Sequence, residues 1–171
     1  MIERYEIDPG ESMFLAVVII VSIIMFSCGA FVAVMTMKKD IIDTHRIAGV
    51  KAEINDLLYT WLQNKLDNKR ISDYFIERHI NKIAVYGFGD LGERFVDDLS
   101  MGDRKIHISY IIDKDADMIE TEYDVITPDA VTDDVDAIVV TPIQLFHGIK
   151  EYLSKRVNCE IISLEDVING I

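Results

Sequence analysis

The chain has 171 residues, half of them hydrophobic, and a formal net charge of −13, so it has room for one modest domain and additional segments. Because nucleic-acid binding needs a basic face, this acidic composition argues against nucleic acid as a partner. It also argues against broad adhesion to an anionic membrane surface.

The first distinctive segment is an uncharged stretch of 25 residues, 13–37, which is followed at once by Lys38 and Lys39. At about 1.5 Å per residue, a helix of this length exceeds the roughly 30 Å hydrocarbon core of a bilayer. The sequence therefore predicts a transmembrane helix over 13–37, so that the lipid bilayer would be a partner. A buried core helix is the alternative.

The segments that flank this stretch differ in charge. Residues 1–12 contain one Arg and four acidic residues, whereas four basic residues lie between positions 38 and 51. The positive-inside rule then predicts a single-pass cell-membrane protein, with residues 1–12 outside and the C-terminal part in the cytoplasm. Cys159 would lie in a reducing compartment, so no disulfide is expected.

The segment 38–80 is expected to be a helical linker. Its first part, up to about residue 69, has apolar residues at a 3,4 spacing, namely Ile47, Val50, Ile54, Leu57 and Trp61. This stripe suits a homodimer formed through residues 41–66, and it equally suits a helix that packs back on its own domain. A turn at 67–69 and a short helix with Ser72 as its N-cap are predicted to follow.

From residue 81 to 171 the pattern alternates between short apolar strands and amphipathic helices. We expect strands over 82–86, 106–112, 124–126, 135–140 and 160–163, and helices over 90–100 and 143–155. Near-continuous apolar strands separated by helices are typical of a parallel sheet that is covered on both faces. The predicted fold class is α/β, with a small, doubly wound, mostly parallel sheet of about five strands of the Rossmann-like type.

The most informative motif is G-x-G-x-x-G at Gly87, Gly89 and Gly92, between the first strand and the first helix of this domain. In dinucleotide-binding folds the first glycine permits a tight turn and the second lets a phosphate approach the backbone. The third glycine allows the helix to pack closely on the sheet. The N-terminus of the helix supplies N–H donors for an anion.

Asp113 lies 21 residues after Gly92, at the end of the second strand. A carboxylate in that place would accept hydrogen bonds from a ribose diol, which favours NAD over NADP. Asp90 could instead cap the helix itself and repel a diphosphate, and Lys114 could shift the specificity either way. A fold that keeps the glycines for its turn and binds nothing is the alternative.

The segment after the fourth strand is a second candidate wall of the pocket. Thr141 and Pro142 would line the far end of a ligand there, together with His147, or they would only start the next helix. Tyr110 and Lys114 stand in Y-x-x-x-K register but on a strand, where they cannot share a proton path. We therefore predict no catalytic residues and no metal site.

Residues 71–168 resemble the nucleotide-sugar-binding, CoA-binding-like N-terminal domains of bacterial polysaccharide epimerase, dehydratase and sugar acyltransferase proteins. The resemblance rests on the segments KIAVYGFGDLGERF, YIIDKDAD, DAIVVTP and CEIISLEDVI. It implies a Rossmann-like fold that binds NAD or a nucleotide sugar, and envelope-polysaccharide enzymes as partners. It also implies that a phosphate or sugar would be surrounded by Gly87, Phe88, Gly89, Asp90, Leu91 and Gly92, with Asp113 at the ribose.

These observations together predict a membrane-anchored, nucleotide-binding accessory or regulatory module in cell-surface polysaccharide synthesis. Two alternatives stay open. One is a subunit of an NAD-dependent nucleotide-sugar epimerase or oxidoreductase that a partner chain completes. The other is a ligand-free membrane scaffold.

Overall fold

The computed structural model describes residues 9–101 and 106–171. The chain divides into two compact units, Met1–Lys51 and Ala52–Ile171. Residues 52–80, which the sequence assigns to a linker, thus belong to the unit that contains the sheet.

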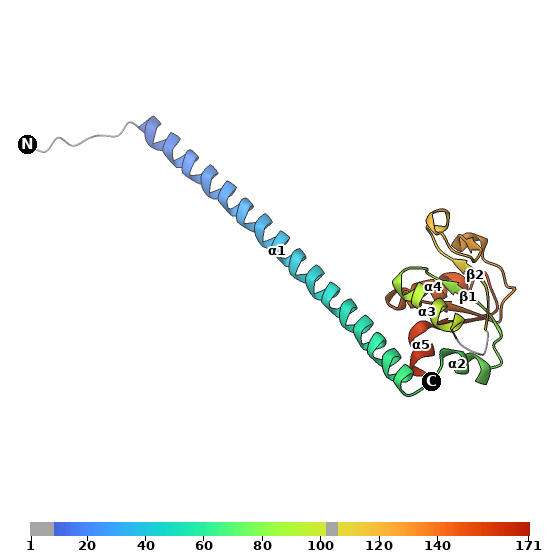
Figure 1. Ribbon diagram of the computed structural model, residues 1–171. Helices are drawn as coiled ribbons and strands as arrows, with labels where there is room; N and C mark the ends of the chain where they lie inside the picture. Colours follow the sequence, from blue (N-terminus) through green and yellow to red (C-terminus); the bar gives the residue numbers. More distant parts are fainter. Residues whose placement is uncertain (1–8, 102–105) are drawn as a thin grey trace, which may run out of the picture. The chain divides into compact units, whose positions relative to one another are not determined.

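The first unit contains most of a long helix, α1 (Pro9–Leu66), which continues into the second unit (Figure 1). Apolar side chains in its first part, among them Val17, Ile24 and Phe26, are exposed. The uncharged stretch 13–37 is part of this longer helix, which runs without a break into the charged residues beyond it.

This unit overturns the membrane prediction. A crossing needs about 20 consecutive, mainly apolar residues, and in the parts of the chain that the structure describes no helix meets that requirement. The predicted single-pass placement, with residues 1–12 outside and the C-terminal part in the cytoplasm, is therefore wrong. The transmembrane assignment of residues 13–37 is not supported either.

The second unit begins with the last part of α1, which packs on the sheet domain. Leu57 and Trp61 are buried there, and Asn64 Nδ2 donates a hydrogen bond of 2.7 Å to the carbonyl oxygen of Ile168. For Leu57 and Trp61, the alternative of a helix that packs back on its own domain is therefore correct. Leu58 and Leu62 are exposed, and the homodimer through residues 41–66 stays a prediction.

The sheet of this unit has five parallel strands, as expected for an α/β fold. Across the sheet their order is β3 (Val125–Ile126), β2 (His107–Ile112), β1 (Lys82–Tyr86), β4 (Ala137–Val140) and β5 (Glu160–Ser163). The central strand β1 pairs with β2 on one side and with β4 on the other. The chain thus builds the sheet outward from β1 in both directions.

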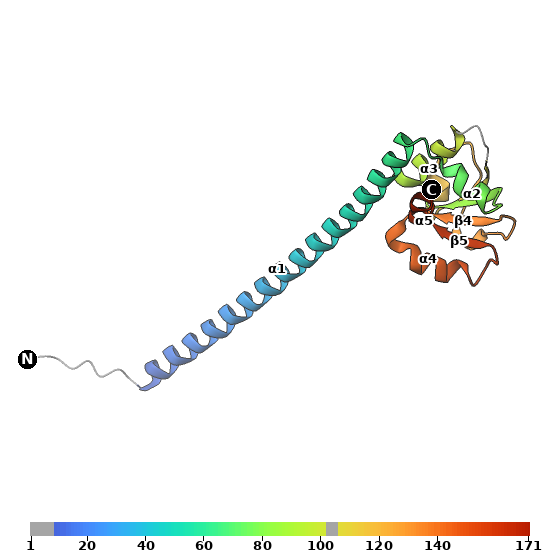
Figure 2. The ribbon, with the colours of Figure 1, turned by 90° about the horizontal axis from the view of Figure 1, so that it is seen from below.

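Helices cover both faces of the sheet, and alternate residues of each strand point to opposite faces. Ile83 and Val85 of β1 face a core formed with α1, α2, α3 and α5, whereas Ala84 faces a core formed with α4. Figure 2 shows α3 and α4 on opposite sides of the strands. Both faces are apolar, which explains why β4 is buried throughout.

The helices of the unit are α2 (Ile71–Glu77), α3 (Asp90–Ser100), α4 (Phe146–Leu153) and α5 (Leu164–Asn169), with short 3₁₀ turns at Ala116–Met118, Pro128–Ala130 and Ile143–Leu145. The predicted Ser72 N-cap is wrong, because the N-cap of α2 is Arg70, whose backbone is extended. Ser72 lies inside α2 and is buried.

Candidate functional site

The strand order places a cavity at the carboxyl edge of the sheet. Going outward from β1, the chain crosses to β2 on one side and to β4 on the other, and ligands of parallel α/β sheets bind at such a reversal of direction. A cavity of about 420 Å³ opens there, between the loop that follows β1 and the loop that follows β4. We call it the glycine-loop cavity; its size is typical of small-molecule sites.

Gly87 forms the turn that leaves β1. Its φ of +89° is a conformation that other residues rarely adopt, and a Cβ there would lie 2.8 Å from Pro142 Cδ. Its N–H still donates to the carbonyl of Ile112 at 2.8 Å, which extends the pairing with β2. The turn is therefore fixed by the sheet on one side and by the loop after β4 on the other.

Gly92 is required because α3 approaches this turn closely. A Cβ on Gly92 would collide with the carbonyl oxygen of Gly87. Thr141 fastens the same carbonyl, because its buried Oγ1 donates to Gly87 O at 2.8 Å. Thr141 thus holds the shape of the turn in addition to lining the cavity.

Gly89 differs from its two neighbours in the motif. It is the N-cap of α3 with extended backbone, and no atom lies within 4 Å of the position that its Cβ would take. The first bond of the helix joins Glu93 N to Gly89 O at 3.0 Å, so the N–H groups that precede Glu93 have no acceptor within the helix. Nothing in the packing of the described residues requires a glycine at position 89.

Two carboxylates stand beside the loop. Asp113 accepts hydrogen bonds from the backbone N–H of Phe88 at 2.8 Å and of Asp115 at 3.0 Å, which ties the end of β2 to the glycine loop. Asp90 is exposed, and its carboxylate does not cap the described helix. Burial and the charge of Asp113 raise the pKa of Tyr86.

The cavity brings together nine of the ten binding residues that the sequence predicts, namely Gly87, Gly89, Asp90, Leu91, Gly92, Asp113, Lys114, Thr141 and Pro142. The tenth, Phe88, contributes its backbone N–H, whereas its side chain packs against the hydrophobic core and does not line the cavity. The Lys114 side chain is 82% exposed and lies 3.4 Å from Asp115.

Sequence reasoning missed one wall of the cavity, which is formed by Tyr86, Leu145 and Ile149. Leu145 and Ile149 are four residues apart across the start of α4, and this spacing was the available signal. His147, proposed for this wall, is exposed and outside the lining. The wall is mainly apolar and suits a flat ring better than a charged group.

Other reactive side chains do not converge on the cavity. Tyr110 is on β2, and its hydroxyl donates to Thr132 O at 2.6 Å, so the Y-x-x-x-K register forms no catalytic pair. Burial raises the pKa of the Cys159 thiol to about 11. Among the described residues, no group of three His, Cys, Asp or Glu side chains is placed to hold a metal ion.

The geometry of this site therefore supports binding, and it offers helix N–H donors, a carboxylate and an apolar wall around one cavity. Comparisons of the chain with protein-family models, curated proteins and solved structures gave no match.

Proposed function

We propose that the glycine-loop cavity binds a nucleotide or a nucleotide sugar and that the domain is a Rossmann-like binding module. The observation that carries the proposal is a difference in packing among the three glycines of the motif. Packing requires Gly87 and Gly92, whereas Gly89 adjoins open space at the start of α3. Because glycine has no side chain, a phosphate can approach the backbone closely at such a position at a helix N-terminus.

In this proposal each part of the cavity meets one part of the ligand. The N–H groups at the start of α3 donate to a phosphate. Asp113 accepts from a ribose diol, since each of its oxygens accepts one hydrogen bond from the described residues and a carboxylate has about four acceptor sites. The wall of Tyr86, Leu145 and Ile149 contacts a base or a nicotinamide ring. NAD fits this arrangement, and so does a nucleotide sugar.

The proposed role is accessory or regulatory, because the described residues that line the cavity include no catalytic pair. Ligand binding orders the loop at one end of α3. At the other end, Asp98 Oδ2 accepts a 2.6 Å hydrogen bond from Trp61 Nε1 on α1. A ligand that binds one arrangement of α3 more tightly than another would shift the equilibrium between the two arrangements. The hydrogen bond between Asp98 and Trp61 would transmit this shift to α1.

The link to cell-surface polysaccharide synthesis rests on the sequence resemblance of residues 71–168. It makes enzymes of that class the proposed protein partners.

The test is a thermal-shift and calorimetry screen of the full chain against NAD(H), NADP(H), CoA, and UDP- and dTDP-sugars. Ligand at 100 times its dissociation constant adds about 2.7 kcal/mol of stability, which gives a shift of several degrees. One ligand class should give such a shift, and Asp113→Ala should reduce it.

The decisive variant is Gly89→Leu, which fills the space at the loop, and its matched control is Gly148→Leu. Gly148 in α4 also has no atom within 4 Å of its Cβ position, but it does not line the cavity. We expect Gly89→Leu to abolish the ligand shift at an unchanged apo melting temperature and Gly148→Leu to keep the shift. A flat response to the whole panel, or equal binding by both variants, contradicts the proposal and favours the ligand-free scaffold.

A further inference from the structure

A groove with a volume of about 320 Å³ runs between the last part of α1 and the helix α3. We call it the helix groove. It is lined by Leu58, Trp61, Leu62 and Lys65 on the side of α1 and by Arg94, Asp97, Asp98 and Met101 on the side of α3. All these residues belong to the unit 52–171, and none of them lines the glycine-loop cavity. An occupant of the helix groove would therefore be additional to a ligand in that cavity.

The open side of the helix groove is apolar. Leu58, Leu62 and Met101 are 42%, 55% and 80% exposed, whereas Trp61 is buried. Leu58 and Leu62 are four residues apart on α1, so they lie on the same face of the helix, and the exposed Leu66 continues this face. Single exposed apolar side chains are normal on a protein surface, but a group of them around one groove marks an interaction surface.

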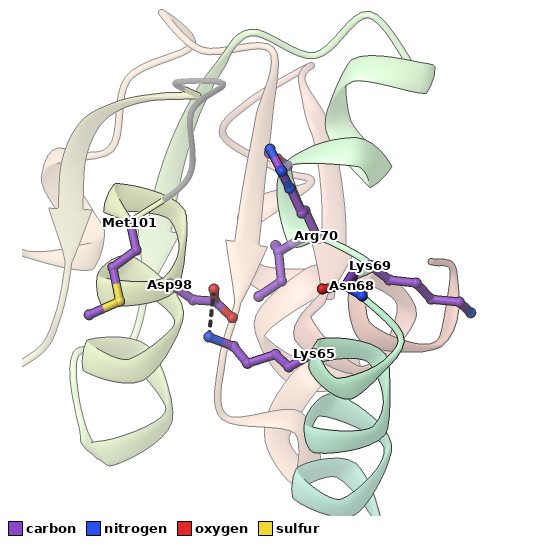
Figure 3. A pocket seen from close by; sticks show the side chains of 8 residues that line it. Lys65, Asn68, Lys69, Arg70, Asp98 and Met101 are labelled. Atoms are coloured by element: carbon purple, nitrogen blue, oxygen red, sulfur yellow. Dashed lines mark ion pairs between the residues drawn. The ribbon is translucent and has the colours of Figure 1, made fainter.

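Polar contacts hold the two walls of the helix groove together. Asp98 Oδ1 lies 2.9 Å from Lys65 Nζ, and Asp98 Oδ2 accepts a hydrogen bond of 2.6 Å from Trp61 Nε1. Figure 3 shows Lys65 extending from α1 toward Asp98 on α3, with Met101 at the end of the same helix. The groove is therefore already formed in the single chain, which lowers the entropy cost of association with a partner.

The charges of the lining indicate what kind of partner fits. Two cations, Lys65 and Arg94, balance two anions, Asp97 and Asp98, so the lining is neutral, whereas the whole chain has a net charge of −13. Two copies of such an acidic chain repel each other through their net charge. This repulsion is weakest where both signs are balanced, and the helix groove combines that balance with exposed apolar side chains.

The exposed charges of the helix groove are also complementary to themselves. Arg94 Nη1 lies 3.2 Å from Asp97 Oδ2, and these side chains are 68% and 53% exposed. In a two-fold dimer the same patch lies on both partners, so that residue i contacts residue j and residue j contacts residue i. Arg94 of each copy can then face Asp97 of the other copy. A partner with charges of one sign would instead place a like charge against Arg94 or Asp97.

We infer that the helix groove is the interface of a homodimer, in which a second copy of this chain covers Leu58, Leu62 and Met101 while Arg94 and Asp97 pair between the copies. This interface differs from a pairing of α1 helices through residues 41–66, because α3 contributes one wall of the groove. The inference goes beyond the proposed nucleotide site and does not depend on it, so the nucleotide screen and a dimer assay can fail separately.

The test is sedimentation velocity of the full chain over a range of protein concentrations, in which the unmodified chain should change from monomer to dimer. Leu62→Gln should weaken this association at least about tenfold, because a two-fold dimer loses two leucine contacts. Met118→Gln is the matched control, since Met118 is an exposed apolar residue outside the groove, and it should dimerise like the unmodified chain. Both side chains are exposed, so both variants should keep the fold.

A charge exchange tests whether the partner is a second copy. Arg94→Glu makes positions 94 and 97 both negative, and Asp97→Lys makes both positive, so each variant alone should associate about tenfold more weakly. An equimolar mixture of the two variants should form heterodimers, because opposite charges then face each other. Lys155→Glu controls for net charge, since Lys155 lies 2.9 Å from Glu151 and outside the groove. It should dimerise like the unmodified chain.

Three results would overturn the inference. The first is a chain that stays monomeric over the whole concentration range, whatever other protein it binds. The second is a self-association that Leu62→Gln does not weaken, which would place the interface elsewhere, for example on the exposed apolar residues of α1 in the first unit. The third is a mixture of the Arg94→Glu and Asp97→Lys chains that forms no heterodimer, because Arg94 and Asp97 would then not meet between the copies.

Discussion

The glycine-loop cavity and the pocket at the turn between α1 and α2 are built in opposite ways. Around the glycine loop, the donors are backbone groups held by close packing, and two carboxylates, Asp90 and Asp113, stand beside them. The pocket at that turn is lined by long polar side chains, among them Lys65, Lys69 and Asp98. The difference teaches that, in one domain, the first surface depends on the shape of the backbone and the second on side-chain charge. Substitutions should therefore affect the two sites through different quantities.

The largest expected effect comes from the shape of the glycine loop. Gly92→Ala forces a Cβ against the Gly87 carbonyl, which is backbone and cannot move aside. We expect a loss of about 3 kcal/mol or more in the free energy of unfolding, measured by urea denaturation. Gly89→Ala is the control and should stay within about 0.5 kcal/mol of the unmodified chain. Equal costs for the two variants would refute the distinction between packed and open glycines.

The next largest effect concerns Asp98, whose carboxylate contacts Lys65 and Trp61. Asp98→Asn removes the charge that neutralises Lys65 and weakens the hydrogen bond to Trp61. Stability should fall by about 1–2 kcal/mol, because hydrogen bonds to charged groups are the stronger ones. Urea denaturation measures this loss, and an unchanged stability of the Asp98→Asn variant would contradict the assigned role of the Asp98 carboxylate.

A smaller difference should appear in the response to salt. The ion pair between Lys65 and Asp98 relies on partly exposed charges, which salt screens over about 8–10 Å at physiological ionic strength. The glycine loop relies on backbone hydrogen bonds at fixed positions. Raising sodium chloride should therefore reduce the stability difference between the unmodified chain and Lys65→Gln, and it should change the cost of Gly92→Ala less. Urea denaturation at two salt concentrations checks this, and equal salt effects on both variants would count against the contrast.

The smallest effect concerns a carboxylate at the opposite, amino edge of the sheet. Hydrogen bonds from the backbone N–H groups of Asn81 and Lys82, at 2.8 and 2.9 Å, hold the pKa of Asp136 below its usual value of 3.8. The ionised form therefore stabilises the fold above that usual value, and this contribution is lost as the pH falls through the lower pKa of the folded state.

Asp136→Asn should accordingly cost no more than about 1 kcal/mol at pH 7, because the group is exposed. It should also reduce the loss of stability upon acidification below about pH 4. Urea denaturation at several pH values measures both quantities. The variant should bind nucleotide normally, since Asp136 does not line the glycine-loop cavity. A steeper acid dependence than that of the unmodified chain would contradict this account.

The sequence predicts the centre of the sheet domain well, because local and tertiary signals agree there. The bounds of β1 and α3 match the expected 82–86 and 90–100, since an apolar strand, a glycine turn and an amphipathic helix follow one another without overlap. The short helix α5 was missed. Its signal was Ser163, whose side chain accepts from Glu165 N at 3.2 Å and caps the helix.

The errors occurred where one segment fits two environments. The length of the uncharged stretch 13–37 led to the membrane prediction. Among the described residues, however, no helix is both long enough and apolar enough for a crossing. Ser72 has the residue type of an N-cap, but its neighbours Ile71, Tyr74 and Phe75 bury it in the core. The apolar wall of the cavity was missed because Tyr86 and Ile149 are brought together only by the sheet.

The contact between Asn64 and Ile168 also bears on how the chain is made. These residues are 104 positions apart, and the apolar face of α1 at Leu57 and Trp61 packs in the same core as α5. On a ribosome that adds about 5–20 residues per second, this face emerges roughly 5–20 s before its partner helix. During that interval, Trp61 and its neighbours stay accessible to chaperones and to other nascent chains. Translation speed along residues 67–164 therefore sets how long the aggregation-prone surface of α1 is exposed.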